Sequence, residues 1–300
     1  SEMCIRDRDS NITKKKNAKR EYIYRKRIPY GIMNFVTVRR DDCYYVDKTD
    51  FIEEIERSNM YFFYIRPRRF GKSLTLSMLK QYYDINMADR FEELFGGLYI
   101  GENPTPEHNT YLIISLNFAV VDANLENYKK GLDAHCNTEF NYFCDVYAQY
   151  LPANIKEEMN RKDGAVEQLD YLCKECKKTG QKVYLFIDEY DHFTNTILAE
   201  PDCLNNYQAE THGMGYLRKF FDTIKSATDS TLERVFVTGV SPVTMDDLTS
   251  GFNIGTNYSL SYEFNEMTGF TEEEVREMLT YYTDCLLYTS DAADERSSVD

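Results

Sequence analysis

The sequence has no run approaching the roughly 20 apolar residues that a membrane-spanning helix requires. It also has no Asn-Lys-x-Asp motif, the pattern that reads guanine in GTP-binding proteins. These absences argue against a membrane protein and leave GTP specificity without support. Hydrophobic residues make up 42% of the 300 residues, which is enough for one sizeable core, and the net charge of -15 describes an acidic protein.

Metal-binding patterns of cysteine and histidine are scarce. Cys173 and Cys176 have zinc-type spacing, but the sequence has neither a second such pair nor two closely spaced histidines. We expect these two thiols to lie one turn apart on a helix over residues 166–178, as packed or idle side chains rather than ligands. The scatter of the remaining cysteines indicates reduced thiols and a cytoplasmic protein.

A glycine turn that opens a helix is present. Residues 61–66 predict a strand, and residues 74–79 have helical spacing with good helix formers. The turn between them gathers backbone N–H groups around phosphate oxygens, its lysine reaches the outer phosphates and its serine holds Mg²⁺. The candidate phosphate-binding residues are Arg69, Phe70, Gly71, Lys72, Ser73 and Leu74.

A second strand supplies carboxylates. Residues 183–187 are apolar on both faces, as in a central parallel strand, and Asp188 and Glu189 follow directly. Asp188 would bind Mg²⁺ together with Ser73, and Glu189 would orient and deprotonate the attacking water. Alone, the motifs leave a plain strand-to-helix turn and a polar strand exit open. Together they predict a P-loop protein that binds ATP and Mg²⁺.

These motifs resemble those of the AAA-ATPase-like family. The resemblance rests on RPRRFGKSL at residues 66–74, YVDKT at 45–49 and LFIDEYD at 185–191, and it covers about residues 28–282. Arg66 stands where the usual P-loop pattern has its first glycine, a replacement that belongs to this family's own pattern. The resemblance implies an α/β P-loop NTPase fold with three layers, αβα. Its core would be a mostly parallel sheet of the additional-strand type, in the order 5-1-4-3-2.

The sequence also predicts the elements around the motifs. We expect strands at residues 61–66, 111–118, 183–187, 234–238 and 258–264, a short helix at 88–95 and a long helical insertion at 124–178. In P-loop ATPases of this type, the strand between the P-loop strand and the acidic strand ends in a polar sensor. Thr238 is our candidate and Ser241 is the alternate. Thr271 and Glu274 form a capping box that begins a helix.

The sequence predicts five segments. They are a tail at 1–8, a basic arm at 9–27, the P-loop ATPase-like domain at 28–267, the start of a lid-like helical segment at 268–284, and a second tail at 285–300. The basic arm would contact nucleic acid or an acidic partner, or form a solvated tail. Residues 28–56 would lie near the nucleotide base or serve as a packing strap. The three arginines at 66, 68 and 69 would bind phosphate or pair at the surface.

The two tails can derive from one inverted DNA element. Residues 3–7 can be encoded by ATGTGTATAAGAGAC, and the reverse complement of this string, read in a shifted frame, encodes the Leu-Leu-Tyr-Thr of residues 286–289. Both ends therefore resemble translated sequencing adapters, which are excluded from fold reasoning. We expect neither tail to belong to the folded domain. In many members of the family a PD-(D/E)xK nuclease-like domain follows, and the chain stops before such a domain would begin.

Three classes of function remain open. The first is Mg-dependent ATP hydrolysis coupled to a conformational change, which would make the protein a hydrolase acting on the β–γ phosphoanhydride. The second is a nucleotide-gated switch or scaffold with little turnover that regulates a missing C-terminal nuclease-like domain. The third, a kinase, is disfavoured because a glutamate poised over water favours hydrolysis. Expected partners are ATP, a second copy of the chain, and nucleic acid through the missing domain.

Overall fold

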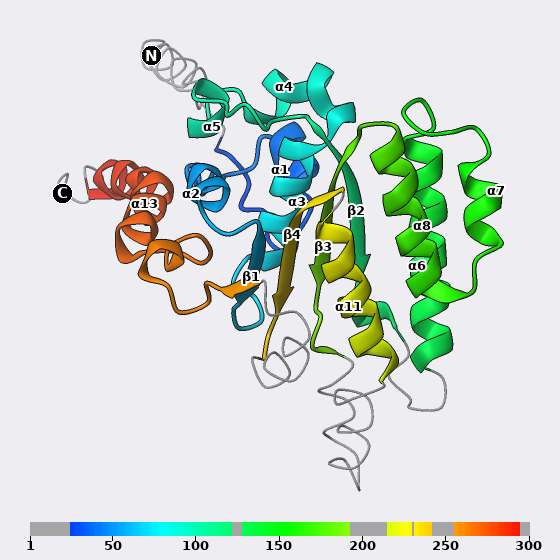
Figure 1. Cartoon of the computed structure of the whole chain (residues 1–300). Coiled ribbons are helices and arrows are strands. Elements are labelled where there is room, and N and C mark those ends of the chain that lie inside the picture. The colour runs from blue at the N-terminus through cyan, green and yellow to red at the C-terminus, as the bar shows by residue number, and fades with distance from the viewer. Residues whose placement is uncertain (1–24, 122–127, 193–214, 230, 242–254, 295–300) are drawn as a thin grey trace, which may run out of the picture.

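The computed structural model describes residues 25–121, 128–192, 215–229, 231–241 and 255–294 of the chain (Figure 1). The expected tail at 1–8 and most of the expected basic arm at 9–27 lie outside these residues.

Helices and strands alternate along the described chain. Five strands are present there: β1 (Tyr61–Ile65), β2 (Tyr111–Asn117), β3 (Lys182–Asp188), β4 (Leu232–Gly239) and β5 (Thr256–Asn257). The helices before β2 are α1 (Phe35–Arg40), α2 (Phe51–Arg57), α3 (Lys72–Tyr83), α4 (Phe91–Phe95) and α5 (Tyr99–Glu102). The later ones are α6 (Tyr128–Val146), α7 (Ile155–Asn160), α8 (Gly164–Lys178), α11 (Tyr216–Thr228) and α13 (Glu272–Asp294). Short 3-10 helices are η2 (Ile85–Arg90), η3 (Phe118–Val120) and η4 (Tyr262–Phe264).

The described strands form one sheet in the order β2-β3-β4-β1-β5, and every neighbouring pair is parallel. Read from the β5 edge, the order is 5-1-4-3-2. β4 lies between the glycine-turn strand and the acidic strand, with Val237 opposite Phe63 on one side and opposite Ile187 on the other. The predicted α/β fold with a mostly parallel sheet is confirmed.

The two faces of the sheet bury different side chains, because successive residues of a strand point to opposite faces. One face is mostly aliphatic and packs against α6, α7, α8 and α11. Its strand residues include Ile65, Ile114, Leu185 and Val237. These helices lie together on one side of the sheet in Figure 1.

The other face is aromatic. Its strand residues are Phe62, Tyr64, Tyr111, Tyr184, Phe186 and Phe236, and they pack against α1, α2, α3 and α4. Phe62 stacks on Phe236 at a centroid distance of 5.0 Å, and Tyr184 stacks on Phe186 at 4.2 Å. Such ring pairs add to the hydrophobic burial. The glycine turn and α3 therefore rest on a rigid aromatic layer.

The structure corrects two local predictions. The fifth strand is β5 at Thr256–Asn257, whereas residues 258–264 contain a turn and η4. The helix predicted at 88–95 is divided between η2 and α4. At 258–264 the aromatic residues that suggest a strand instead insert singly into the core: Phe264 is fully buried and packs against Phe62.

The insertion before β3 is helical, as predicted, and consists of α6, α7 and α8. Cys173 and Cys176 lie on α8, both fully packed in the aliphatic core, where burial raises the pKa of Cys173 to about 12. Within the described ranges, no cluster of three or more His, Cys, Asp or Glu residues could hold a metal ion. None of the helices there combines the length and apolar character that crossing a membrane would require.

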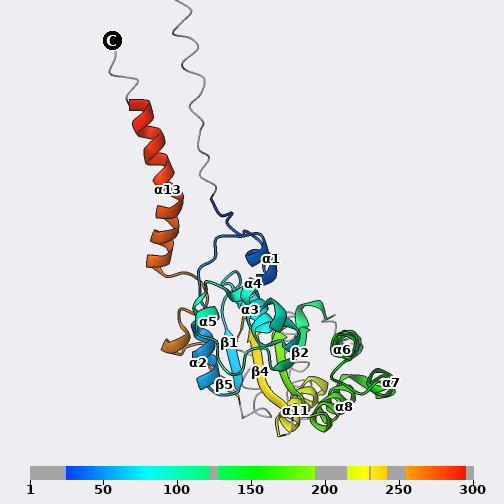
Figure 2. The same ribbon diagram turned by 90° about the horizontal axis from the view of Figure 1, so that it is seen from above.

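The capping box at the start of α13 is confirmed. The Thr271 N–H donates to Glu274 Oε2 at 2.8 Å, and the Glu274 N–H donates to Thr271 Oγ1 at 3.2 Å. Figure 2 shows that α13 extends away from the sheet and the helices that cover it. The helix continues to Asp294, through the first part of the expected second tail.

Candidate functional site

The phosphate-loop candidate connects β1 to α3. Gly71 is the residue before the helix and has φ +88°, a left-handed conformation that glycine adopts without the strain of a Cβ atom. The first N–H groups of α3 have no acceptor within the helix, and the helix dipole makes this end electropositive. The loop therefore presents the donors and the partial charge that suit an anion.

Lys72 lies inside the loop rather than in solvent. Its side chain is buried, and its Nζ donates to the carbonyl oxygens of Arg66 at 3.0 Å and Pro67 at 3.2 Å. These are neutral acceptors, so the ammonium charge is hydrogen-bonded but has no counter-ion in direct contact among the residues that the structure describes. A phosphate entering the loop would supply that charge.

Ser73 in the first turn of α3 contacts Asp188 at the end of β3. Asp188 ends β3, and Ser73 Oγ donates to its Oδ2 at 3.3 Å. Burial raises the pKa of Asp188, and the Glu189 N–H, the Lys72 charge and the Ser73 hydroxyl each act to lower it. A hydroxyl and a carboxylate are hard oxygen ligands of the kind that Mg²⁺ prefers. The sequence prediction that these two residues lie together agrees with this contact.

Glu189 begins the turn after β3. Its φ of +53° is uncommon for a residue with a side chain, and it turns the chain sharply beyond the sheet. Burial raises the pKa of the Glu189 carboxyl, partly opposed by the charge of Lys72. A raised pKa is the property that a carboxylate needs to act as a general base near neutral pH.

Thr238 lies on β4, between the two motif strands. The residue is fully buried, and its Oγ1 is one of four buried side-chain oxygens in the described part of the chain that have no hydrogen-bond partner. Its carbonyl accepts the Tyr190 N–H at 3.1 Å, which ties the end of β4 to the acidic turn. An unpaired buried hydroxyl costs free energy unless a water or a ligand contacts it.

The sequence reasoning assigned no role to Asp191, which the structure shows to join two turns. Asp191 is fully buried, and its carboxylate accepts the N–H groups of Val240 at 3.1 Å and Ser241 at 2.6 Å. A Cβ at Gly239 would lie 2.4 Å from Asp191 Oδ1, so the glycine permits this approach. The alternate sensor Ser241 is thus held through its backbone. In the sequence, the position of Asp191 three residues after Asp188 was the feature that could have indicated a role for it.

Arg66 points to protein groups and not into the candidate phosphate site, contrary to the interpretation that the loop arginines bind phosphate. Its guanidinium donates to the carbonyl oxygens of Ser259 and Phe264 and stacks over the Tyr64 ring, with 4.5 Å from Cζ to the centroid. It is therefore committed to the backbone on the β5 side of the loop. Arg68 and Arg69 are exposed on the loop.

Lys80 is a half-buried cation near the site to which the sequence analysis assigned no role. It lies on α3 two turns after Lys72, and its Nζ donates to Ser115 Oγ at 3.2 Å. Burial lowers the pKa of Lys80, while the charges of Asp188 and Glu139 act to raise it. It adds positive charge beneath the carboxylate at the end of β3.

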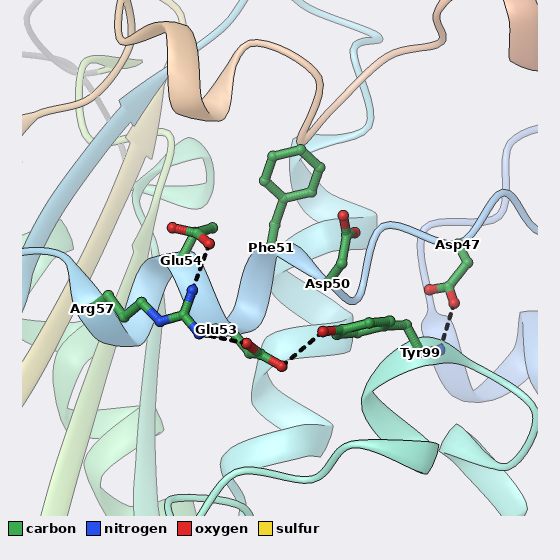
Figure 3. Close-up of a pocket in the computed structure, with 7 residues that line it drawn as sticks. All are labelled: Asp47, Asp50, Phe51, Glu53, Glu54, Arg57 and Tyr99. Carbon is green, nitrogen blue, oxygen red and sulfur yellow. Dashed lines mark hydrogen bonds and ion pairs between the residues drawn. The ribbon is translucent and has the colours of Figure 1, made fainter.

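A separate hollow of about 550 Å³ lies over α2 (Figure 3). Its polar groups pair with one another: Arg57 donates to Glu53 at 2.8 Å and Glu54 at 2.9 Å, and the Tyr99 hydroxyl donates to Glu53 at 3.0 Å. Small-molecule sites are mostly apolar, whereas this lining is dominated by carboxylates. We assign it no ligand, and the contact of Asp47 with the Tyr99 N–H at 2.7 Å supports the packing-strap interpretation of residues 28–56.

The family model described as Predicted AAA-ATPase matches residues 29–249. The chain belongs to this family. A relative from Azotobacter chroococcum mcd 1, named "Uncharacterized protein in vnfD 5'region", is 29% identical over 256 residues, which cover 84% of this chain and 44% of the relative. The chain thus spans less than half the length of that Azotobacter protein. No solved structure matches the chain.

Proposed function

We propose that this member of the Predicted AAA-ATPase family binds ATP with Mg²⁺ and hydrolyses it. The observation that carries the proposal is the contact between Ser73, at the amino end of α3, and Asp188, at the carboxyl end of β3. The strand order, read as 5-1-4-3-2, supports assigning the sheet to the additional-strand type of P-loop NTPase. Family membership supports the nucleotide as ligand.

Each residue of the loop has a part in holding the nucleotide. Residues 69–74 would surround the phosphates with backbone N–H groups, and Lys72 would exchange its two carbonyl acceptors for phosphate oxygens. Ser73 and Asp188 would hold Mg²⁺, which neutralises charge that develops on the phosphate oxygens. Gly71 keeps the backbone in the conformation that directs the N–H groups inward.

Hydrolysis would use the neighbouring strand ends. Glu189 would accept a proton from the attacking water, a role that its raised pKa favours near neutral pH. The Thr238 hydroxyl would contact the γ-phosphate or that water, which would give its unpaired oxygen a partner. Glu189 directly follows β3, and Thr238 lies near the end of β4. These two strands are neighbours in the sheet, so the sheet fixes the distance between the two residues.

The nucleotide-gated switch is the second candidate, and one contact favours it. The Phe70 carbonyl in the loop accepts the N–H of Gly269 at 2.9 Å, two residues before the capping box of α13. The loop and the lid-like segment are therefore directly joined. A second copy of the chain and a nuclease-like domain that contacts nucleic acid are proposals that rest on the family resemblance.

Calorimetric titration with MgATP tests nucleotide binding. The Lys72→Ala variant should lose about 1.5–3 kcal/mol of binding free energy, the range for hydrogen bonds to charged groups. Lys174→Ala, which removes an exposed lysine on α8, is the matched control and should bind like wild type. Equal affinity in a folded Lys72→Ala variant would remove the P-loop assignment.

A further inference from the structure

The end of β1 is bound to a segment almost two hundred residues later. Arg66 donates to the carbonyl oxygens of Ser259 and Phe264, which are 193 and 198 residues away in sequence. The Ile65 N–H donates to Ser259 Oγ at 2.8 Å. The Tyr64 hydroxyl donates to the Phe264 carbonyl at 3.1 Å. The planar guanidinium suits such a double contact because its donors have a fixed geometry.

The other end of the phosphate loop is bound to the same segment. The Phe70 carbonyl accepts the Gly269 N–H at 2.9 Å. Gly269 has φ +80°, and a Cβ there would lie 3.3 Å from Cδ1 of the Phe70 ring, so only glycine fits this approach without strain. Thr268 contributes a 3.0 Å contact between its Oγ1 and the Tyr64 hydroxyl.

The segment continues directly into α13. Its first turn is held by the capping box of Thr271 and Glu274, and Glu274 also forms a partly buried ion pair with Lys48. Beyond this point α13 extends away from the sheet (Figure 2). We call residues 259–269 the clasp segment. It has contacts with both ends of the phosphate loop, and it leads through residues 270 and 271 into the first turn of α13.

We propose that Arg66 is a positioning residue that holds the phosphate loop against the clasp segment, and that nucleotide binding is thereby coupled to this segment and to α13. The proposal rests on the proposed function. A glycine at position 66 could adapt the loop to phosphate by itself, whereas Arg66 makes the loop conformation depend on residues 259–269. Coupling between two sites is reciprocal, so a docked clasp segment favours nucleotide and nucleotide favours a docked clasp segment.

The test compares Arg66→Ala with Arg68→Ala, which removes an exposed arginine of the same loop. Amide hydrogen exchange of residues 259–275 is measured with and without MgATP, beside calorimetric affinity and steady-state kinetics. We expect Arg66→Ala to speed exchange in the clasp segment about tenfold and to raise KM similarly with kcat nearly unchanged, because loop positioning contributes to uniform binding. In wild type, MgATP should slow exchange across residues 259–275. Arg68→Ala should leave exchange in the clasp segment as in wild type.

Several results would overturn the proposal. Unchanged exchange in Arg66→Ala would show that the arginine does not hold the segment, and faster exchange with wild-type affinity would remove the coupling. Wild type that binds MgATP without any change in exchange would overturn the coupling and leave the proposed function intact, whereas absence of MgATP binding would overturn both. Gly269→Ala breaks the clasp at its other end, and it should reproduce the exchange and KM changes if Arg66→Ala does not fold.

Discussion

The amino end and the carboxyl end of the sheet differ in how their charged side chains are compensated. Folding lowers the pKa of Glu107 at the amino end and raises the pKa of Asp188 and Glu189 at the carboxyl end. At the amino end, Arg234 on β4 donates two hydrogen bonds to Glu107, at 2.7 and 2.8 Å, and the Tyr111 hydroxyl adds a third at 2.6 Å. Burial by itself would raise the pKa of Glu107, but the bonds from Arg234 and Tyr111 outweigh it and leave the pKa below its usual value. Arg234 also donates to the Glu56 carbonyl at 3.2 Å.

At the carboxyl end, the polar groups are less well compensated. Burial raises the pKa of both Asp188 and Glu189, Thr238 Oγ1 has no partner, and Lys72 is bound to neutral carbonyls. The strands are continuous between the two ends, so the difference lies in the partners and not in the backbone. The hydrogen-bonded pair of Arg234 and Glu107 stabilises the fold, whereas the raised pKa values of Asp188 and Glu189 agree with the ligand site proposed at the other end.

The largest effect should come from breaking the amino-end network. Arg234→Met leaves the half-buried Glu107 without its charge partner and should lower the free energy of unfolding by about 3 kcal/mol, measured by urea denaturation; this is the low end of the range for a buried pair because the Glu107 side chain is 29% exposed. The control is Lys182→Ala, because the Lys182–Glu233 pair has side chains 48% and 43% exposed and should be worth less than about 1 kcal/mol. A loss of MgATP affinity by the folded Arg234→Met variant would contradict the separation of the two ends.

The next effect concerns activity at the carboxyl end. Glu189→Gln removes the proposed base and should reduce phosphate release about a hundredfold or more while MgATP affinity is retained. The free energy of unfolding should not fall, because the substitution removes a half-buried charge whose desolvation outweighs its attraction to Lys72. Undiminished hydrolysis would exclude Glu189 as the base. Wild type with no phosphate release would favour the switch.

A matched pair of hydroxyl deletions separates the ends further. Tyr111→Phe removes a hydrogen bond to a charged group and should cost about 1.5–3 kcal/mol of stability. Thr238→Val removes a hydroxyl without a partner and should leave stability unchanged or raised, while phosphate release falls. Denaturation and phosphate-release assays on both variants would check this. A destabilised Thr238→Val variant would show that the hydroxyl is structural.

The smallest effect is a difference in pH dependence. The pKa of Glu107 is lowered by folding, so the stability that it contributes is present at neutral pH and is lost as the pH falls through that pKa. The pKa of Glu189 is raised by folding, so its ionised form costs stability at neutral pH, and the cost disappears as the pH falls. At pH 7, Glu107→Gln should therefore be less stable than wild type and Glu189→Gln more stable. Toward about pH 4 the Glu189 difference should disappear, whereas the Glu107 difference should persist there and shrink only at lower pH, because the folded pKa of Glu107 lies below its usual value. Differences of the same sign would refute the contrast.

Much of the site could be predicted because its two motifs are local. A strand, a glycine turn and a helix follow one another around Lys72, and an apolar strand ends directly at Asp188, so short sequence patterns suffice. The capping box at Thr271 is local as well. The fifth strand was mispredicted because the aromatic residues Tyr258 and Phe264 resemble strand residues in sequence but pack against Phe62 from a turn and a 3-10 helix.

The sequence by itself determined the alternation of strands and helices, the glycine turn before α3 and the acidic end of β3, since backbone preference and hydrophobic periodicity act over a few residues. Only the tertiary structure decided where the long side chains go. Arg66 extends to carbonyls 193 and 198 residues away, and Arg234 pairs with Glu107 across 127 residues. Such partners are brought together by sheet order and core packing, and no pattern within either segment specifies them. The same packing gives one end of the sheet the pair of Arg234 and Glu107, and it brings Ser73 beside Asp188 at the other end.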